Sequence, residues 1–267
     1  MNRAGPFVAG IGLLVVVLAI VFARSWKSHR EQPGALRRRA LEVWGKTGLH
    51  WSPRTYLTIH TAVALIATIA GLAIFSRLAD WISDQAAITR FDVRFDDRLH
   101  AAATPIGIAI AQAFSFIGGP TAMAVLMFSG IVYLLVRRER TVLYGWLIAF
   151  IGGGALDWAL KTIFHRDRPA FPKAFVHALG FSFPSGHSMG SLIGFGMLAY
   201  IIIHTVGDRR ADILVGVVAG LIVLAVGFSR LYLGAHYPSD VLAGFAAGIV
   251  WLAACISAIE IAAPAPT

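Results

Sequence analysis

The sequence predicts an all-α integral membrane protein, built from a six-helix transmembrane core and one extra transmembrane helix at the N-terminus. Hydrophobic residues make up 57% of the 267 residues and charged residues only 14%, whereas soluble chains carry about 25% charged residues. The mean hydropathy of +0.72 places the chain in the membrane class. Seven apolar stretches are long enough, or nearly so, to cross a hydrocarbon core of about 30 Å. They run approximately over residues 7–23, 56–79, 120–136, 141–163, 185–206, 213–233 and 238–262.

A further apolar run, at residues 101–117, is shorter and rich in small residues. It follows the charged segment 90–98, in which Arg and Asp residues alternate with apolar ones. We expect this run to form an interfacial or partly buried helix that does not cross the membrane. If it did cross, every later segment would lie on the opposite side.

Basic turns distinguish these two topologies, because cytoplasmic loops of membrane proteins are enriched in Lys and Arg. The linker between the first two spans contains eight Lys and Arg residues and only two acidic residues. Residues 137–140 and 207–210 form two further short basic turns. All three segments are cytoplasmic only if 101–117 does not cross. We therefore predict an outer N-terminus, a cytoplasmic C-terminus and a multi-pass location in the inner or plasma membrane.

The chain divides into two predicted parts. Residues 1–55 would form an N-terminal transmembrane anchor with a basic cytoplasmic linker, and residues 56–267 a membrane domain. We assign the net charge of +9 to cytoplasmic loops and anionic lipid headgroups and not to nucleic-acid binding. The lipid bilayer is therefore the expected partner, and the oligomeric state is left open. The single cysteine, Cys255, lies in an apolar run and indicates no compartment.

Three polar clusters lie on the outer side of this topology, where an excess of basic residues is unexpected. They cover residues 161–169, 184–187 and 229–240, each at an end of an apolar span. Each cluster contains Lys, Arg or His residues. We therefore predict that the clusters converge on one face of the helix bundle and bind an anion there.

The residue types in these clusters suit phosphoryl transfer. A phosphoryl group in transfer spreads negative charge over its equatorial oxygens. Guanidinium groups bind such oxygens bidentately, and a Lys adds a point charge. Lys161, Arg168 and Arg230 are the candidates for these cations. Pro184 and Pro238 each suit the first turn of a helix, so two helix N-termini would offer free backbone N–H groups to the anion.

Two histidines in the clusters are candidates for the bond-making steps. His236 can attack phosphorus as a neutral imidazole, and His187 can protonate the departing oxygen. Asp240, four residues after His236, has suitable spacing to fix the tautomer of that histidine. Ser185 and Gly186 would add a hydroxyl group and a close backbone approach. The carboxylates and histidines lack metal-ligand spacing, so we predict no metal and no other cofactor.

The three clusters resemble the signature of the type 2 phosphatidic acid phosphatase superfamily. Its pattern is K-x6-R-P, then P-S-G-H, then S-R-x5-H-x3-D, and each part is complete here. The matching residues are Lys161, Arg168, Pro169, Pro184, Ser185, Gly186, His187, Ser229, Arg230, His236 and Asp240. The resemblance covers about residues 56–262, with the Gly118-Gly119 pair as a weaker feature.

The resemblance implies a six-helix phosphatase core that works without a metal ion. It implies that His236 is the nucleophile, that Asp240 orients it and that His187 is the general acid. The implied phosphate-binding residues are Lys161, Arg168, Ser185, Gly186 and Arg230.

We therefore expect a lipid phosphate or pyrophosphate phosphatase that acts through a phosphohistidine at the outer (periplasmic or extracellular) membrane face. Candidate substrates are undecaprenyl pyrophosphate, phosphatidic acid and phosphatidylglycerol phosphate, and the sequence does not separate them. A lipid phosphotransferase would use the same residues, and the fate of a labelled phosphate would distinguish the two enzymes. A lipid-phosphate transporter or binding protein would need polar residues in broken helices at the membrane midplane, whereas the charges here lie mainly at one face.

Overall fold

A computed structural model describes residues 53–83, 87–171, 175–176, 179–206 and 209–262 of the chain. All regular secondary structure within these ranges is helical. The helices are α3 (Pro53–Ser83), α4 (Ala87–Ala101), α5 (Pro105–Ile117), α6 (Pro120–Val136), α7 (Arg140–Phe164), α8 (Gly186–Val206), α9 (Arg209–Tyr232) and α10 (Pro238–Ala262). The extra N-terminal span and the basic linker predicted within residues 1–55 lie outside the described residues, apart from the start of α3.

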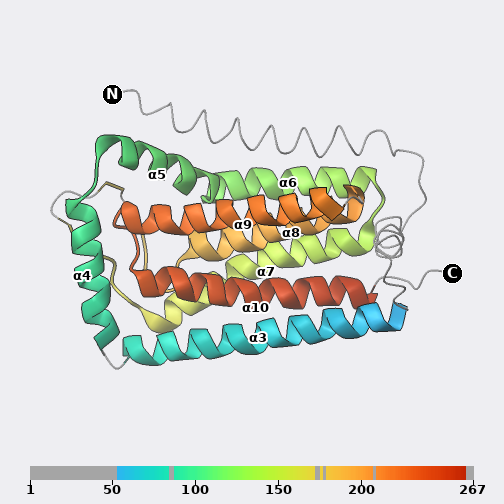
Figure 1. Ribbon diagram of the computed structural model, residues 1–267, viewed down its shortest axis with the longest axis horizontal. Coiled ribbons are helices and arrows are strands. Elements are labelled where there is room, and N and C mark those ends of the chain that lie inside the picture. The colour runs from blue at the N-terminus through green and yellow to red at the C-terminus, as the bar shows by residue number, and fades with distance from the viewer. Residues whose placement is uncertain (1–52, 84–86, 172–174, 177–178, 207–208, 263–267) are drawn as a thin grey trace.

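Six stretches in the described part of the chain are long and apolar enough to cross a membrane. They are α3, the α5–α6 pair, α7, α8, α9 and α10. These helices run side by side along the long axis of the molecule, while α4 crosses one end of the bundle (Figure 1). With 25 residues, α7 is about 37 Å long, enough to cross a hydrocarbon core of about 30 Å. The predicted six-helix core of a multi-pass membrane protein is thus confirmed.

The apolar run at 101–117, predicted as an interfacial or partly buried helix, forms the partly buried helix α5, and α5 joins α6 in one discontinuous span. α5 begins at Pro105, after Thr104, whose hydroxyl accepts a hydrogen bond from the backbone in the first turn. The helix ends at Gly118, and α6 begins at Pro120. A proline suits a first turn but disrupts a helix interior, so the Gly-Gly-Pro sequence separates two coaxial halves. Each half looks too short by itself, yet the predicted number of crossings is unchanged.

The helix that crosses the bundle end is α4, which contains the charged segment 90–98. Asp92 and Asp96 face the bundle and are almost completely buried. The exposed face of α4 carries Arg90, Arg94 and Arg98. Charged residues on both faces make burial in the hydrocarbon core costly, which explains why α4 lies across the end of the bundle.

Large apolar side chains fill the interior of the bundle. Leu126, Trp146 and Met197 are completely buried. The indole N–H of Trp146 donates to the Met127 carbonyl at 3.0 Å, so the largest core residue has its polar atom satisfied. The outer surface is also apolar, with Ile66 still 67% exposed, as expected for helices that face lipid.

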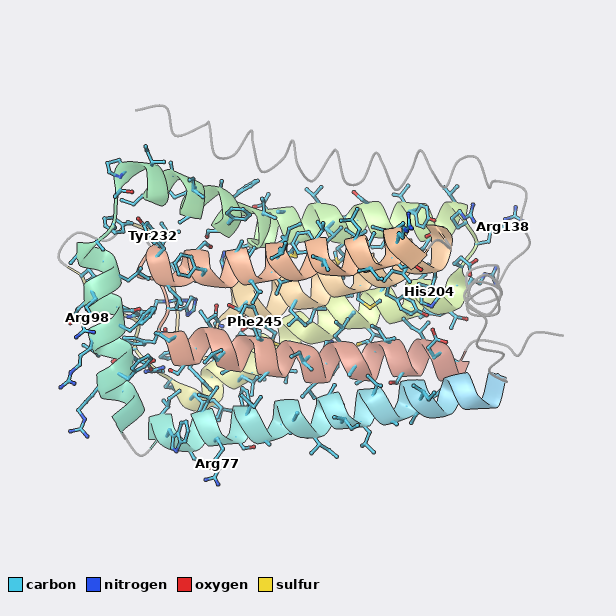
Figure 2. The ribbon with its side chains drawn as sticks, viewed as in Figure 1. Arg77, Arg98, Arg138, His204, Tyr232 and Phe245 are labelled. Carbon is cyan, nitrogen blue, oxygen red and sulfur yellow. The ribbon has the colours of Figure 1, made fainter. Side chains whose placement is uncertain are left out.

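The two ends of the bundle differ in the residues that they carry. Arg98 and Tyr232 mark the end crossed by α4, and Arg138 and His204 mark the opposite end (Figure 2). The basic turn between α6 and α7 lies at this opposite end. The three polar clusters therefore lie at the α4 end, and the basic turn at 137–140 lies at the other end of the bundle.

α8 and α10 approach each other closely where both helices begin. A Cβ atom on Gly244 would lie 2.5 Å from the Ser185 carbonyl oxygen and 3.0 Å from the Ser188 Cβ. The Ser185 backbone N–H donates to the Asp240 carbonyl at 2.9 Å. Glycine at position 244 thus permits the contact that places the second cluster beside the third.

Gly244→Ala is expected to lower the thermal unfolding temperature of the purified protein, because its methyl group meets backbone atoms of α8. Overpacking of this kind costs about 1–3 kcal/mol. Gly220→Ala is the matched control, since a Cβ on Gly220 meets nothing within 4 Å and alanine favours the helix. Equal unfolding temperatures for the two variants would contradict this close packing.

Cysteine labelling tests the topology. Cys255→Ala removes the single cysteine, and Leu179→Cys or Arg138→Cys then places one exposed thiol at either end of the bundle. A membrane-impermeant maleimide is expected to label Leu179→Cys in intact cells, but Arg138→Cys only after permeabilisation, as basic cytoplasmic turns require. The reverse pattern would place the polar clusters on the cytoplasmic side.

Candidate active site

The predicted polar clusters meet at the end of the bundle that α4 crosses. Lys161 lies in the last turn of α7, Gly186 begins α8, Arg230 lies in the last turn of α9, and residues 233–237 lead into α10. Together these segments border a cavity of about 630 Å³. The polar part of its lining consists of Ser115, Asp157, Lys161, Arg168, His187, Arg230 and His236.

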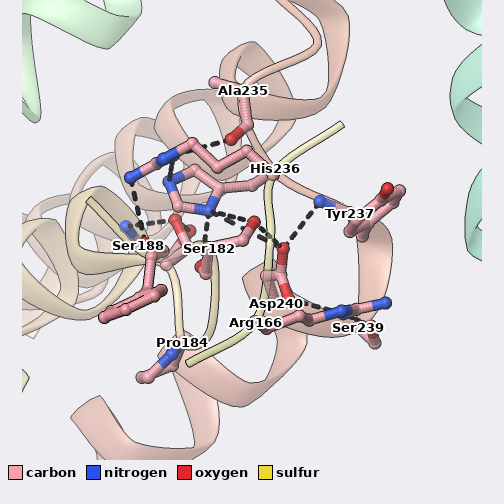
Figure 3. Close-up of polar contacts among 12 residues, drawn as sticks. Arg166, Ser182, Pro184, Ser188, Ala235, His236, Tyr237, Ser239 and Asp240 are labelled. Carbon is pink, nitrogen blue, oxygen red and sulfur yellow. Dashed lines mark hydrogen bonds and ion pairs between the residues drawn. The ribbon is translucent and has the colours of Figure 1, made fainter. Parts of the chain in front are cut away.

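His236 lines this cavity with its two ring nitrogens in different surroundings (Figure 3). Nδ1 lies 2.8 Å from the Ser182 carbonyl oxygen, which can only accept, so Nδ1 carries the proton. Nε2 lies 3.0 Å from NH1 of Arg168, which can only donate, so Nε2 is the acceptor. The lone pair of Nε2 therefore points toward the Arg168 guanidinium at the cavity.

The protonation state of His236 also suits a nucleophile. Burial lowers the pKa of this histidine to about 4, although the nearby Asp240 carboxylate opposes the shift. Positive charge on Arg168 and Arg230 contributes in the same direction as burial. The ring is therefore uncharged at neutral pH, the state in which an imidazole nitrogen can attack.

Asp240 holds His236 less directly than its sequence spacing predicts. The Asp240 Oδ2 atom is 3.7 Å from His236 Nδ1, beyond a normal hydrogen bond. Oδ2 instead accepts from Ser182 Oγ at 2.5 Å and from the Tyr237 backbone N–H at 2.9 Å. Asp240 thus acts on His236 mainly by fixing the position of Ser182, whose carbonyl accepts the hydrogen bond from His236 Nδ1.

Lys161 is held between α7 and α8. Its ammonium group donates to Asp157 Oδ1 at 2.6 Å and to the Pro184 carbonyl at 2.5 Å. A Cβ on Gly186 would lie 2.7 Å from Asp157 Oδ2, so glycine leaves the space that this ion pair occupies. The ammonium group has a third hydrogen, which can bind an anion in the cavity.

Arg168 anchors a loop as well as lining the cavity. Its Nε and NH2 atoms donate to the carbonyls of residues 179–181 at distances of 2.8 to 3.1 Å. NH1 donates to the Ala235 carbonyl at 2.7 Å and faces His236. Burial is the main cause that lowers the pKa of Arg168, but a guanidinium stays charged in proteins.

Arg230 places a second guanidinium at the cavity. The residue is only 3% exposed, and its NH1 donates to the Ser115 hydroxyl on α5. Its buried Nε has no hydrogen-bond partner among the described residues. Buried polar groups are normally paired, so a guanidinium with an unpaired donor is a feature expected of an anion site.

The start of α8 differs from the prediction. The helix begins at Gly186, so Pro184 precedes it, after a cis peptide bond, and does not occupy the first turn. Ser185 is completely buried and accepts a hydrogen bond from Ser188 Oγ at 3.0 Å. Ser185 therefore lies behind the cavity lining, whereas Gly186 contributes to it. Pro238 is the first residue of α10, as predicted.

His187 lies in the first turn of α8 and lines the same cavity as His236. Its Nε2 atom is 3.5 Å from the position that a Cβ on Gly119 would take. The break between α5 and α6 thus leaves room for the imidazole of His187. Both histidines border the space in which an anion would be held.

Arg166, Asp92 and Ser182 join the site although the sequence reasoning did not select them. Arg166 forms ion pairs with Asp240 at 2.6 Å and with Asp92 at 2.8 Å. The sequence contains a weak signal for this, namely an Arg two positions before Arg168 and two Asp residues four positions apart within a highly charged segment. The separation of 74 residues on either side of Arg166 conceals the link.

Residues 143–262 match the PAP2 superfamily. A segment of 92 residues is 39% identical to phosphatidylglycerophosphatase B of Bacillus subtilis (strain 168), covering 34% of this chain and 45% of that protein. The chain thus spans about half the length of this curated relative.

Solved structures show the same fold. The crystal structure of a transmembrane PAP2 type phosphatidylglycerolphosphate phosphatase from Bacillus subtilis aligns with a TM-score of 0.65 and 27% identity, over 71% of this chain and 94% of that chain. The crystal structure of Aquifex aeolicus LpxE aligns with a TM-score of 0.51 and 20% identity, over 62% and 94% of the two chains, and is similar in fold alone. The complete three-part signature lies at one end of a six-span bundle of this fold, within the segment of the chain that matches the PAP2 superfamily.

Proposed function

We propose that the protein is a lipid phosphate or pyrophosphate phosphatase that forms a phosphohistidine intermediate on His236. The orientation of His236 is the main support for this proposal. Its Nδ1 is bound to a backbone carbonyl, and the lone pair of its Nε2 faces the cations of the cavity. A phosphate that binds these cations would lie within reach of a neutral imidazole nitrogen.

The proposed reaction has two steps with His187 as the proton carrier. Nε2 of His236 attacks phosphorus and forms a P–N bond, while the P–O bond to the lipid breaks and the imidazolium form of His187 gives its proton to the departing oxygen and becomes neutral. Water then attacks the phosphohistidine, and neutral His187 accepts its proton. Inorganic phosphate leaves, and both histidines return to their starting states.

Three side-chain cations would stabilise the transition state. Lys161, Arg168 and Arg230 line the cavity from three different segments. Pre-positioned cations lower the energy of a transferring phosphoryl group, whose charge lies on its equatorial oxygens. These residues supply positive charge at the site itself, so we propose that turnover needs no added metal ion.

The cavity also supports a lipid as the substrate. Beyond the cationic end, its walls are formed by Met123 of α6, Phe150 of α7 and Ile193 of α8. Gly190 lies between these walls and the polar end, and a Cβ there would meet nothing within 4 Å. The cavity thus pairs a phosphate-sized cationic region with an apolar region between transmembrane helices.

Phosphatidylglycerol phosphate is the first substrate to test. The curated relative and the aligned crystal structure from Bacillus subtilis are both named as phosphatases of this lipid. Undecaprenyl pyrophosphate and phosphatidic acid also present a terminal phosphate on a long apolar chain, and they serve as comparison substrates. We place the reaction at the outer face of the membrane, because the site lies at the end of the bundle opposite the basic turn between α6 and α7.

His236→Ala is expected to lower kcat for phosphate release from phosphatidylglycerol phosphate by about a thousandfold or more, because the nucleophile is lost. His165→Asn is the control, since His165 is an exposed histidine directly after α7 that does not line the cavity. Both assays are run in EDTA on detergent-purified protein with an unchanged unfolding temperature. Substantial activity of the His236 variant, or loss of wild-type activity in EDTA, would contradict the proposed chemistry.

Gly190→Leu is expected to lower activity toward lipid substrates and to leave activity toward soluble substrates largely intact. Its side chain enters the apolar part of the cavity, so kcat/KM for phosphatidylglycerol phosphate is expected to fall at least about tenfold. Turnover of p-nitrophenyl phosphate, which has no long chain, is expected to persist. Gly220→Leu on α9 is the control, because Gly220 is equally open but lies outside the cavity. Equal losses on both substrates would argue against the apolar region as the lipid site.

A further inference from the structure

The inner face of α4 carries two carboxylates that enter the bundle near the active site. Asp92 is 0% exposed and Asp96 is 2% exposed, although α4 covers an end of the molecule. Burying a carboxylate is costly unless the charge is paired or neutralised. Two buried carboxylates on one short helix therefore indicate that α4 makes specific polar contacts with the end of the bundle.

Asp92 is fully engaged with residues near the start of α10. Its Oδ1 accepts from the Ser239 backbone N–H at 3.2 Å, and its Oδ2 accepts from the Ser239 hydroxyl. Oδ2 also forms the 2.8 Å ion pair with NH2 of Arg166. Asp96 has no hydrogen-bond partner among the described residues, and burial together with Asp92 raises its pKa to about 8. Burial thus favours the protonated form of Asp96, and the ion pair with Arg166 is made by Asp92.

The guanidinium group of Arg166 forms hydrogen bonds with two helices, α4 and α10. NH2 faces Asp92 on α4, while NH1 donates to Asp240 Oδ1 at 2.6 Å and to Ser239 Oγ at 2.7 Å on α10. The same group lies 4.3 Å above the ring of Tyr237. Burial opposes the charge of Arg166, but Asp240 and Asp92 outweigh it and raise its pKa. Arg166 thus binds both carboxylates as a permanent cation, and Figure 3 shows it beside Asp240.

The contacts continue from Asp240 to the nucleophile. The oxygen of Asp240 that does not face Arg166 accepts from Ser182 Oγ at 2.5 Å. The Ser182 carbonyl oxygen in turn accepts a hydrogen bond from His236 Nδ1, at an N–O distance of 2.8 Å. An unbroken series of contacts therefore runs from α4 through Arg166, Asp240 and Ser182 to His236. Neither Arg166 nor Asp92 lines the cavity, so neither would touch a substrate.

We propose that Asp92 and Arg166 are positioning residues that hold His236 in its reactive orientation by fixing Asp240 and Ser182. Without Asp92, Arg166 keeps its charge but loses the contact that directs its NH1 toward Asp240. Asp240 and Ser182 could then shift, and Nε2 would no longer point at phosphorus. This inference rests on the proposed role of His236 and adds the requirement that α4 be docked for the nucleophile to work.

The test is Asp92→Asn in the full chain, purified in detergent and assayed with phosphatidylglycerol phosphate. Asparagine keeps the shape and the acceptor for Ser239 but removes the charge that attracts Arg166. We expect kcat to fall by up to about 100-fold, as expected for a misdirected reactive group, with KM nearly unchanged. Asp97→Asn is the matched control, because Asp97 is the exposed neighbour on the same helix. It is expected to behave like the wild type.

A second measurement separates positioning from simple structural support. Vanadate resembles the five-coordinate transition state and bonds to the attacking nitrogen, whereas phosphate resembles the ground state. For Asp92→Asn, the inhibition constant of vanadate is expected to rise in parallel with the loss of kcat, while that of phosphate stays close to the wild-type value. A purely structural role would lower the unfolding temperature and leave the ratio of the two constants unchanged.

Three results would overturn the inference. They are wild-type kcat in Asp92→Asn, parallel weakening of vanadate and phosphate, and equal effects of Asp92→Asn and Asp97→Asn. If Asp92→Asn does not fold, Arg166→Lys is judged by the same outcomes, since a lysine keeps the charge but cannot bond both carboxylates as a fork. An inactive wild type would instead reject the proposed function, so the two failures are distinguishable.

Discussion

The hydrogen bond from His236 Nδ1 to the Ser182 carbonyl sets the chemistry available at this site. A backbone carbonyl cannot donate, so this contact fixes one tautomer and leaves the lone pair on Nε2. Burial keeps the ring neutral, and Arg168 at 3.0 Å marks the direction in which the lone pair points. The hydrogen bonds of Arg168 with the carbonyls of residues 181 and 235 hold the two loops that carry Ser182 and His236 together. Asp240, in the first turn of α10, fixes the Ser182 side chain.

Among the described residues, the charged side chains of the site lie near helix ends. Lys161, Gly186, Arg230 and Pro238 all lie in first or last turns, so the polar groups share one end while the helix midsections stay apolar. Most of these charges are paired or hydrogen-bonded, as in the contact between Lys161 and Asp157. Arg230 Nε has no hydrogen-bond partner among the described residues, and the cavity is lined by cations, so an anion bound there would be stabilised. An apolar wall that begins beside this region suits an anion attached to a long chain.

The hydropathy pattern was sufficient to predict the six spans that lie within the described residues, and the motif spacing was sufficient to predict that the three polar clusters meet at one end of the bundle. Helix periodicity could not reveal that 101–117 and 120–136 share one span, because each half is short and the Gly-Gly-Pro break hides their continuity. Spacing placed Asp240 near His236 but could not show that Ser182 comes between them. The link from Asp92 to Arg166 depends on the tertiary fold, since 74 residues separate the partners. Motif spacing and helix periodicity describe residues that are close in sequence, so they cannot predict contacts of this kind.

In the proposed reaction, phosphorus becomes bonded to Nε2 of His236. The most direct test is rapid acid-free quenching of the wild-type enzyme with ³²P-labelled phosphatidylglycerol phosphate, followed by peptide mapping. We expect an acid-labile, base-stable label on the peptide that contains His236, formed and lost at rates compatible with kcat. Rapid turnover with no label on the protein, or label on a different residue, would contradict it.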